Sequence, residues 1–402
     1  MSGLILFDDG RGQFGPLTDL RASFELRTGM FTTATRLANC FGELQGVMVP
    51  NALADLVAER SSVPVNRAIE TGTSLFINGR LLLPQGIEKP HVGSAIIEAD
   101  SGAIIAAHLA GADSESMVAT GKLPDSVTCT ELPLGTLAEF PWHILDTLPT
   151  SLLSDIDECR HPDPLMVPES QIMGTFPVKA HATAQIGAGV IIDARNGPVI
   201  LWEHAEVGPN AVICGPASIG PHSSVQAQSL MRANTAIGPH CKVGGEVGGT
   251  IFQGYANKVH DGYLGDSLVG EWVNIGAGSN NSNLLNTYDN VTAVLQTGGP
   301  RHRTNRQFYG TIFGDHSKIA IGTRIMTAAV IGTGAMIATS APISGVVGPF
   351  QWITDATQQI YRSQKFVKVA KSVMERRQVV MTAAYEAAIV HHLEAAQAGT
   401  AS

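Results

Sequence analysis

The chain of 402 residues has few charged side chains and no long apolar run. Charged residues make up 15% of it and the formal net charge is −9, which argues against non-specific binding to nucleic acid. Apolar residues make up 44%, too many for a disordered chain, yet no apolar stretch reaches the ~18 residues that a membrane span needs. We therefore expect a globular protein whose partners are small molecules, and neither nucleic acid nor membrane.

Cysteine is scarce and shows no pattern. The five cysteines stand at positions 40, 129, 159, 214 and 241, and no two of them form a CxxC pair. Such a set is typical of reduced thiols, not of a disulfide framework. The opening "MSGLILFDDG" lacks a basic region, and its apolar run is too short for a secretory signal. These features together predict a cytoplasmic protein.

Residues 1–155 alternate short apolar runs with stretches of helical spacing. "GLILFDD" and "SLFINGRLLL" (74–83) are candidate strands, and "NALADLVAER" (51–60) is a candidate helix. This alternation predicts an α/β, Rossmann-like domain. Residues 156–178 contain four prolines and little periodicity, so we interpret them as a linker.

From about residue 179 to 350 the apolar positions recur every six residues. Leu201, Val207, Ile213, Ile219 and Val225 are six apart, and a second run starts at Ile319 and ends at Ile343. Glycine follows many of these positions, where tight corners need it. A period of six with inward apolar residues indicates a left-handed parallel β-helix of roughly nine coils. Residues 354–398, rich in alanine and long side chains, predict a C-terminal helix that covers the open end of the solenoid or an adjoining subunit.

The repeat places several histidines in one column. His204, His222 and His240 follow one another at intervals of three periods of the repeat, and three periods make one full coil. His260 holds the same phase relative to an inward residue. The column is open to three interpretations: solvated surface, a subunit contact, or a zinc site shared between chains. Imidazoles in successive coils stand about 4.8 Å apart in a row, which does not suit a tetrahedral metal site.

His260 differs from the other histidines in its surroundings. The apolar register slips by two residues in "GGEVGGTIFQGYANKVHDG", and such irregularities often direct a side chain into a site. Lys258 and Tyr263 lie beside it, and an asparagine-rich turn follows in "NIGAGSNNSN" (274–283). A neutral imidazole is a suitable general base, and backbone N–H groups or an asparagine are suitable oxyanion donors. We interpret these residues as an acyl-transfer site that uses a thioester.

At these residues the chain resembles the left-handed β-helix acyltransferases. More narrowly, "HDGYLGDSLVGEWVNIGAG" is similar to the bifunctional enzymes that make UDP-N-acetylglucosamine, namely the glucosamine-1-phosphate N-acetyltransferases fused to N-acetylglucosamine-1-phosphate uridyltransferases. The resemblance implies that His260 is the general base and that Asn283 orients the amino or acetyl group. It further implies two groups of binding residues: Arg232, Lys258, Tyr263 and Asn274 for the sugar phosphate, and Ala277 and Ala338 for acetyl-CoA.

The chain departs from this family pattern in several places. Leu284 replaces a tyrosine that usually follows the asparagine, and Gly248 replaces a lysine. Arg232 is near the family's phosphate-binding arginine but does not align cleanly with it. The basic cluster "RHRTNR" (301–306) has two possible interpretations: it contacts coenzyme A, or it is a solvated turn. Phrases such as "INGRLLLP" and "FPWHILDTLP" resemble a divergent branch of the family over nearly the whole chain.

The N-terminal half resembles the sugar-nucleotide pyrophosphorylases less closely. "DDGRGQFGPLTDLR" supplies Gly10, Gly12 and Gly15, whose backbone N–H groups suit phosphate. Arg21 and Arg27 stand where a phosphate-binding lysine would, and Asp8 or Asp9 is a weak candidate ligand for the Mg²⁺ that nucleotidyl transfer needs. "INGR" occupies the place of an expected Gly-Asp pair. The hypothesis that this domain is degenerate and serves as a scaffold or a sensor stays open.

Together these features predict a homotrimeric enzyme that acetylates glucosamine 1-phosphate from acetyl-CoA. The predicted small-molecule partners are the sugar phosphate, acetyl-CoA and a nucleoside triphosphate such as UTP, with UDP-N-acetylglucosamine as the product if the N-terminal domain is active. The alternatives are acylation of another nucleotide-linked sugar, a sugar-nucleotide sensor without activity, and a zinc-dependent trimer.

Overall fold

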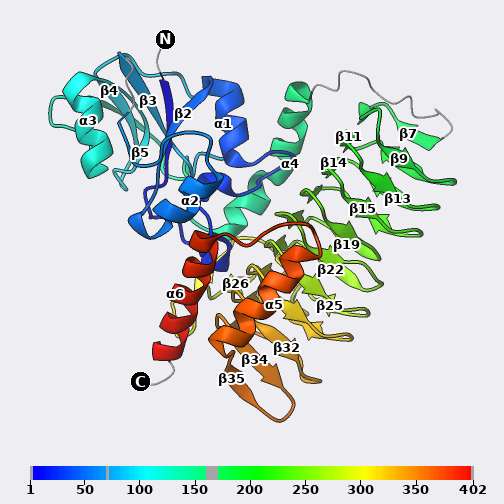
Figure 1. Ribbon diagram of the computed structural model, residues 1–402. Coiled ribbons are helices and arrows are strands. Elements are labelled where there is room, and N and C mark those ends of the chain that lie inside the picture. The colour runs from blue at the N-terminus through cyan, green and yellow to red at the C-terminus, as the bar shows by residue number, and fades with distance from the viewer. Residues whose placement is uncertain (1–2, 69–71, 160–170, 400–402) are drawn as a thin grey trace. The chain divides into compact units, whose positions relative to one another are not determined.

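The computed structural model describes residues 3–68, 72–159 and 171–399 (Figure 1). Its contacts divide the chain into two compact units. The first takes in the chain up to Phe14, Leu20–Thr147 and Thr382–Ala388. The second takes in Gly15–Asp19, Leu148–Met381 and the chain from Ile389 onward. The linker predicted over 156–178 includes the end of a helix and a first short strand, and residues 160–170 of it lie outside the described part.

The first unit is built on a mixed sheet with the strand order β2-β1-β3-β5-β4-β6. Parallel pairs join β1 to β2 and β3 and join β4 to β6, while β5 runs antiparallel to β3 and β4. The strands are β1 (Gly3–Phe7), β2 (Leu44–Met48), β3 (Thr73–Asn78), β4 (Ser94–Glu98), β5 (Ile104–Ala110) and β6 (Thr128–Leu132).

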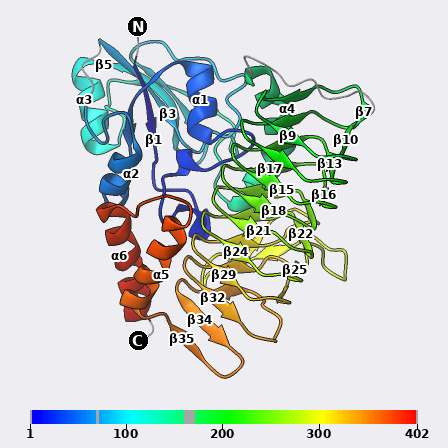
Figure 2. The ribbon, with the colours of Figure 1, turned by 45° about the vertical axis from the view of Figure 1, so that its right-hand side comes forward.

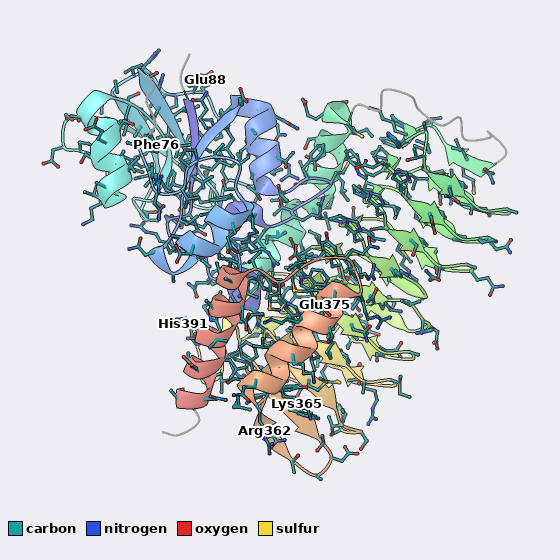
Figure 3. All side chains as sticks on the ribbon, in the orientation of Figure 1. Phe76, Glu88, Arg362, Lys365, Glu375 and His391 are labelled. Carbon is teal, nitrogen blue, oxygen red and sulfur yellow. The ribbon has the colours of Figure 1, made fainter. Side chains whose placement is uncertain are left out.

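Helices cover both faces of this sheet. They are α1 (Thr33–Phe41), α2 (Ala54–Arg60) and α3 (Gly111–Thr120). The chain also forms α4 (Pro141–Glu158), which continues from the first unit into the second, and the 3-10 turns η1 (Gly15–Thr18), η2 (Ser23–Glu25) and η3 (Asn51–Leu53). Leu4 and Leu6 pack with α1 and α2, whereas the alternate residues Ile5 and Phe7 pack with α3. Figure 3 labels Phe76, which is buried in the central strand β3. The continuous apolar run of β1 is therefore explained by burial on both faces.

The second unit is a parallel β-helix whose coils stack along three faces (Figure 2). In the described part of the chain these faces have six, nine and ten strands, and we name each face by that number. The six-strand face comprises β7 (Ile172–Gly174), β10 (Ile191–Ala194), β13 (Val212–Cys214), β16 (Leu230–Met231), β19 (Glu246–Gly248) and β22 (Tyr263–Gly265).

The other two faces run the full length of the solenoid. The nine-strand face comprises β8 (Val178–Ala180), β11 (Val199–Leu201), β14 (Ala217–Ile219), β17 (Thr235–Ile237), β20 (Ile251–Phe252), β23 (Leu268–Val269), β28 (Ile312–Phe313), β31 (Val330–Ile331) and β33 (Val346–Val347). The ten-strand face comprises β9 (Gln185–Ile186), β12 (Glu206–Val207), β15 (Ser224–Val225), β18 (Lys242–Val243), β21 (Asn257–Lys258), β24 (Asn274–Ile275), β29 (Lys318–Ile319), β32 (Met336–Ala338), β34 (Gln351–Thr354) and β35 (Gln358–Ile360).

The inward residues of the repeat form one buried core. Leu201, Ile219 and Ile237 pair in register at the predicted spacing of one full coil. The next coil is shorter, because Ile237 pairs with Phe252. The predicted architecture, an α/β domain followed by a left-handed parallel β-helix, is confirmed.

An insertion interrupts the solenoid between β23 and β28. It leaves the wall at β25 (Asn280–Asn281), which pairs with β30 (Arg324–Ile325), and it contains an antiparallel pair of β26 (Thr292–Ala293) and β27 (His302–Arg303). At the C-terminal end the single helix predicted over 354–398 is two helices, α5 (Ser363–Glu375) and α6 (Ala383–Gly399). Gln378 between them has a φ of 59°, and a left-handed residue ends a right-handed helix. Figure 3 labels Lys365 and Glu375 on α5.

Aromatic rings stack along one corner of the solenoid, and this corner corrects a sequence prediction. His204, His222 and His240 stack with centroids 4.7 and 4.9 Å apart, close to the predicted coil spacing. The next ring in the stack is Tyr255, 4.7 Å from His240, and not His260. The short coil accounts for the difference, because Val243 pairs with Lys258 and not with Asp261, the residue that an unbroken repeat would place opposite it.

No disulfide joins the five cysteines, all of which lie in the described ranges. None of the helices in the described part combines the length and the apolarity that a membrane span needs.

Candidate functional site

His260 lies in the turn that joins the ten-strand face to the six-strand face. Its side chain is exposed, and its ring has no hydrogen-bond partner among the described residues. Gly262 in the same turn has a φ of 108°, and a Cβ there would lie 2.2 Å from the carbonyl oxygen of Ser279. A glycine is therefore required where this turn packs on the next coil, and His260 is left facing solvent.

Lys258 points into the solenoid and not into a substrate pocket. It pairs in register with the inward residue Val243 and is 1% exposed. Its Nζ donates to the carbonyl oxygens of Gly244 at 2.8 Å, His260 at 2.8 Å and Asp261 at 3.3 Å. Burial lowers the pKa of the Lys258 amine to about 8. All three donors are used, so Lys258 fixes the turn that carries His260 and has none left for substrate.

Ala277 lies on the coil adjacent to His260. The turns that contain these two residues stack, because the backbone N–H of Gly278 donates to the carbonyl of Asp261 at 3.2 Å. The Ala277 N–H has no backbone acceptor in the described part of the chain, which suits an oxyanion donor. The N–H of Ala227, in the matching turn of another coil, lacks a backbone acceptor as well, so this property belongs to the repeat and not to Ala277 alone.

Tyr263, Asn283 and Asp266 form one hydrogen-bonded cluster outside the six-strand face. The Asn283 Nδ2 donates to the Tyr263 hydroxyl at 2.9 Å and to Asp266 Oδ2 at 2.7 Å. Both amide protons are therefore used, and Asn283 Oδ1 has no donor among the described residues. Burial and then the charge of Asp266 raise the pKa of Tyr263, and burial raises that of Asp266 despite Asn283 and Arg306. The cluster presents an amide oxygen that can accept from an amine.

The other asparagines of this turn are structural. Asn280 Oδ1 accepts from the Tyr263 N–H and Asn281 Oδ1 accepts from the Gly265 N–H, both at 2.8 Å. These side-chain oxygens replace the backbone carbonyls that would continue the ladder from β22. The sequence shows the crowding of amides here, but it cannot separate the ladder asparagines from Asn283.

Two arginines near this cluster are paired with carboxylates. Arg232 Nε lies 2.6 Å from Glu246 Oε1, and Arg306 lies 3.5 Å from Asp266. Arg306 belongs to the basic cluster at 301–306, so one of its members binds the site's own aspartate. Sequence reasoning missed Asp266 and Arg306. Asp266 stands inside the family phrase, whereas no signal in the sequence connects it to Arg306, which lies on the insertion.

Asn274 opens onto a different face and lines a cavity of about 610 Å³ on the ten-strand face. Ladder pairs place Lys242, Asn257, Asn274 and Lys318 in one outward row over successive coils. The other lining residues are Tyr255, Val259, Trp272, Val373, Arg376 and Arg377. Ala338 is exposed on β32 of the same face but does not line this cavity.

The N-terminal unit has a cavity of about 920 Å³ at the end of β1. Asp8, Asp9, Gly10 and Arg11 line one side of it, and the others include Asn51, Asn66, Thr120 and Lys122. It lies beyond the carboxyl ends of parallel strands, which is the usual ligand position in α/β folds.

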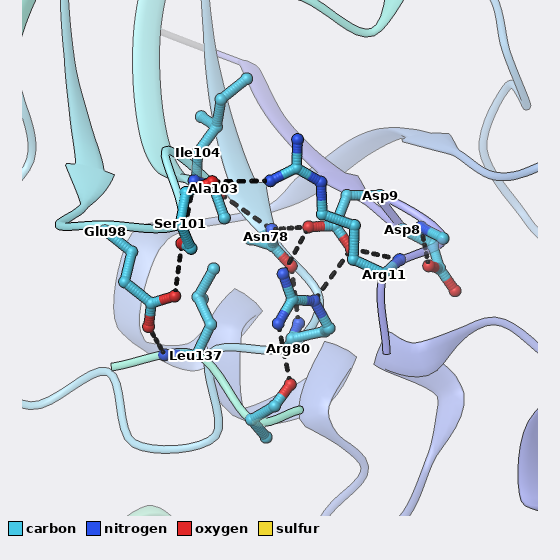
Figure 4. Close-up of polar contacts among 12 residues, drawn as sticks. Asp8, Asp9, Arg11, Asn78, Arg80, Glu98, Ser101, Ala103, Ile104 and Leu137 are labelled. Atoms are coloured by element: carbon cyan, nitrogen blue, oxygen red, sulfur yellow. Dashed lines mark hydrogen bonds and ion pairs between the residues drawn. The ribbon is translucent and has the colours of Figure 1, made fainter. Parts of the chain in front are cut away.

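Asp9 is bound by the domain's own residues (Figure 4). Its carboxylate accepts from Arg80 Nε at 2.8 Å, Arg80 Nη2 at 2.6 Å, Asn78 Nδ2 at 3.0 Å and the Arg11 N–H at 3.1 Å. Arg80 is 4% exposed and also donates to the Ala138 carbonyl at 2.9 Å. Burial raises the pKa of Asp9, but the hydrogen bonds and charge of Arg80 outweigh it, and the net pKa is lowered.

This arrangement does not fit a magnesium ion. Asp8 accepts from the Gly10 N–H at 2.9 Å and the Ser23 N–H at 2.6 Å, while Arg80 supplies the positive charge at Asp9. Within the described ranges, no three His, Cys, Asp or Glu side chains are grouped to hold a metal. The N–H groups of Gly10 and Arg11 point to these aspartates, so they cannot also cradle a phosphate.

The remaining N-terminal candidates do not line this cavity. A Cβ on Gly12 would lie 2.3 Å from the Phe14 ring, so this glycine is needed for packing. Gly15 begins η1, whose Pro16 carbonyl accepts from the Thr333 hydroxyl at 3.3 Å. Arg21 is buried, and Arg27 donates to the Met30 carbonyl. The phosphate contacts of these four residues stay a prediction.

Residues 4–161 match the family model described as sugar nucleotidyl transferase. The N-terminal part of the chain is thus a domain of the sugar nucleotidyltransferase type, followed by a β-helix of the hexapeptide-repeat type. No curated protein matches the chain.

Several solved structures are similar to the chain at low identity. A hexapeptide transferase family protein from Anaplasma phagocytophilum is 13% identical, with a TM-score of 0.21, over 54% of this chain and 96% of that one. The UDP-N-acetylglucosamine acyltransferase of Francisella novicida is 13% identical, with a TM-score of 0.20, over 52% and 74%. An N-acyltransferase from Bacillus cereus, solved with dTDP and 3-hydroxybutyryl-CoA, is 14% identical, with a TM-score of 0.19, over 52% and 91%.

Proposed function

We propose that the protein is a homotrimeric enzyme of sugar-nucleotide biosynthesis that transfers an acetyl group from acetyl-CoA to the amine of glucosamine 1-phosphate. The observation that best supports this proposal is the hydrogen-bonded cluster of Tyr263, Asn283 and Asp266 beside the turn that contains His260. In the proposed reaction, His260 accepts a proton as the amine nitrogen bonds to the thioester carbon. The C–S bond then breaks, and the coenzyme A thiolate leaves and is protonated. Asn283 Oδ1 holds the amine, and the Ala277 N–H faces the developing oxyanion.

The N-terminal domain is proposed to recognise a nucleotide or nucleotide-linked sugar. Its family match supports this role, and its cavity of about 920 Å³ has the volume of a ligand site. Because Asp9 is neutralised by Arg80, we do not assign it a metal-dependent transfer step.

One incubation tests both halves. Purified protein is mixed with glucosamine 1-phosphate, acetyl-CoA, UTP and Mg²⁺, and the products are identified by mass spectrometry. N-acetylglucosamine 1-phosphate alone is the expected product. UDP-N-acetylglucosamine would show that the N-terminal domain is active after all. Binding of sugar nucleotides with no release of coenzyme A from any amino-sugar acceptor would favour a sensor and contradict the acyl-transfer proposal.

A further inference from the structure

Two outward surfaces of the β-helix carry positive charge, and they differ in how that charge is balanced. On the six-strand face, Arg232 is paired with Glu246 and Arg306 with Asp266. Around the cavity on the ten-strand face stand Lys242, Lys318, Arg376 and Arg377, and none of these four forms an ion pair with a described residue. An excess of cations around one concave surface is a site for an anion.

Two of the four cations of this cavity are held in place by hydrogen bonds. Arg377 donates to the carbonyl of His240 at 3.1 Å and to Asn257 Oδ1 at 2.7 Å. Lys318 donates to the carbonyl of Trp272. These contacts use two of the Arg377 donors and one of the Lys318 donors, so the others remain available to a ligand. Fixing a long side chain in advance reduces the entropy that a ligand must overcome on binding.

The rest of the lining suggests what accompanies the anion. Tyr255 and Trp272 are stacked with centroids 4.2 Å apart, and their rings form an apolar wall. Asn257 and Asn274 add amides that can bind hydroxyl groups. The cavity contains no carboxylate among its lining residues. Glu271 lies close enough to Tyr255 that its charge, after burial, contributes to the raised pKa of that tyrosine.

The cavity also adjoins the proposed reaction centre. Val259 lines it and immediately precedes His260 in the chain. From Asn257 to His260 the chain spans at most about 10 Å, so a ligand bound among the cations has its far end within reach of His260.

We propose that this cavity, and not the surface around Arg232, binds the phosphate of a substrate. The shared chemistry is a phosphate ester attached to a ring, which has two sources: an amino-sugar phosphate acceptor or the phosphate-rich end of coenzyme A. The choice of source rests on the proposed acyl transfer, whereas the binding site itself does not.

Isothermal titration with three probes tests the site: pyrophosphate, glucosamine 1-phosphate, and adenosine 3′,5′-bisphosphate as the coenzyme A fragment. The variants are Arg376→Ala and Lys318→Met. The controls are Lys368→Met, an exposed lysine on the helix α5 that precedes Arg376, and Arg232→Ala for the competing surface. We expect Arg376→Ala and Lys318→Met each to weaken binding of at least one probe by ~10-fold or more, because each removes a charge-assisted contact. The two controls should change it by less than ~2-fold.

The result that would overturn the proposal is loss of binding in Arg232→Ala with retention in Arg376→Ala, or no binding of any probe to the wild type. Circular dichroism and thermal melting check that each variant is folded. Which of the two organic probes binds identifies the source of the phosphate. Probe binding without acetyl transfer would contradict the proposed function and leave this site standing, so the two failures are distinguishable.

Discussion

In the N-terminal cavity the carboxylates of Asp8 and Asp9 accept six hydrogen bonds from their own domain. In the β-helix cavity four cations belong to the lining, and none of them forms an ion pair with a described residue. Both regions combine charge with a concave surface, and sequence motifs pointed to both. The difference teaches that the aspartates of the N-terminal motif are poor candidates for ligand contacts even though their cavity can hold a ligand, because satisfied polar groups have little further binding energy to offer.

The largest expected effect is in the N-terminal cavity, where the charged groups are paired. Replacing Arg80 with Met should lower the stability of the N-terminal unit by up to about 3–5 kcal/mol, because Asp9, whose side chain is only 14% exposed, would lose its charged partner. The lowered pKa of Asp9 means that its stabilising contribution is present above the unfolded-state pKa and is lost as the pH falls through the folded-state pKa. Urea unfolding of the N-terminal unit at neutral and acidic pH measures both.

Arg11→Ala is the matched control, since Arg11 makes a single exposed contact with the Ser101 carbonyl. It should cost less than about 1 kcal/mol. Equal losses in the two variants would show that the Asp9–Arg80 pair is not the organising contact.

Lys258 differs from both cavities, because it is a buried cation whose charge is stabilised by backbone carbonyls. Its pKa is near 8 in the folded protein, against 10.5 normally. Between these values the unfolded state binds more protons, so stability should rise with pH by up to about 3 kcal/mol. In Lys258→Met that rise should disappear. Chemical denaturation at pH 7 and pH 10 measures the difference, and the exposed Lys368→Met is the control. If the stability of Lys258→Met rises with pH as much as that of the wild type, the rise does not come from Lys258 and our interpretation of this residue is wrong.

A substitution of His260 tests the proposed reaction centre next to the β-helix cavity. His260→Ala should slow acetyl transfer by ~10²-fold or more if the imidazole is the base, while leaving phosphate binding within ~2-fold of the wild type. His204→Ala removes another exposed histidine elsewhere on the solenoid and should retain full turnover. Coenzyme A release, followed with a thiol reagent, is the measurement. Near-normal turnover in His260→Ala would remove it from the mechanism.

The smallest expected effect is that of Mg²⁺ on ligand binding by the N-terminal domain. Since Arg80 supplies the charge at Asp9, the affinity for UDP-N-acetylglucosamine should differ by less than ~2-fold between Mg²⁺ and EDTA. Titration calorimetry under both conditions is sufficient. A gain of ~10-fold or more with Mg²⁺ that is lost in Asp9→Asn would reverse our interpretation of this cavity.

Much of the β-helix was predictable because its period is short and its inward residues are apolar. The pairs Leu201–Ile219 and Ile219–Ile237 follow directly from the spacing of one full coil. The prediction was wrong at the short coil, where His260 was assigned to the column that Tyr255 occupies. There the inward position is taken by Lys258, a residue that breaks the apolar pattern, so the sequence shows that the register slips but not which corner is shortened.

The functional residues were predictable to a different degree. The family phrase contains Tyr263, Asp266 and Asn274, yet only the structure shows that Asn274 faces another surface than the other two. The role of Arg80 could not be inferred, because it depends on two loops that are distant in the sequence and meet at Asp9. Likewise, Arg376 and Arg377 line the cavity from the segment just after α5, and the sequence pattern does not show which face of the β-helix this segment meets.

The asparagine side chains that end the ladder at β22 have a consequence for how this protein can vary. Two faces of the solenoid continue past the insertion through β23–β28 and β24–β29, while the third is joined there by the amides of Asn280 and Asn281. The wall is thus opened at one place without losing the alignment of the coils above and below. The segment between Asn283 and the return of the chain at β28 can therefore change in length while the coils on either side keep their register.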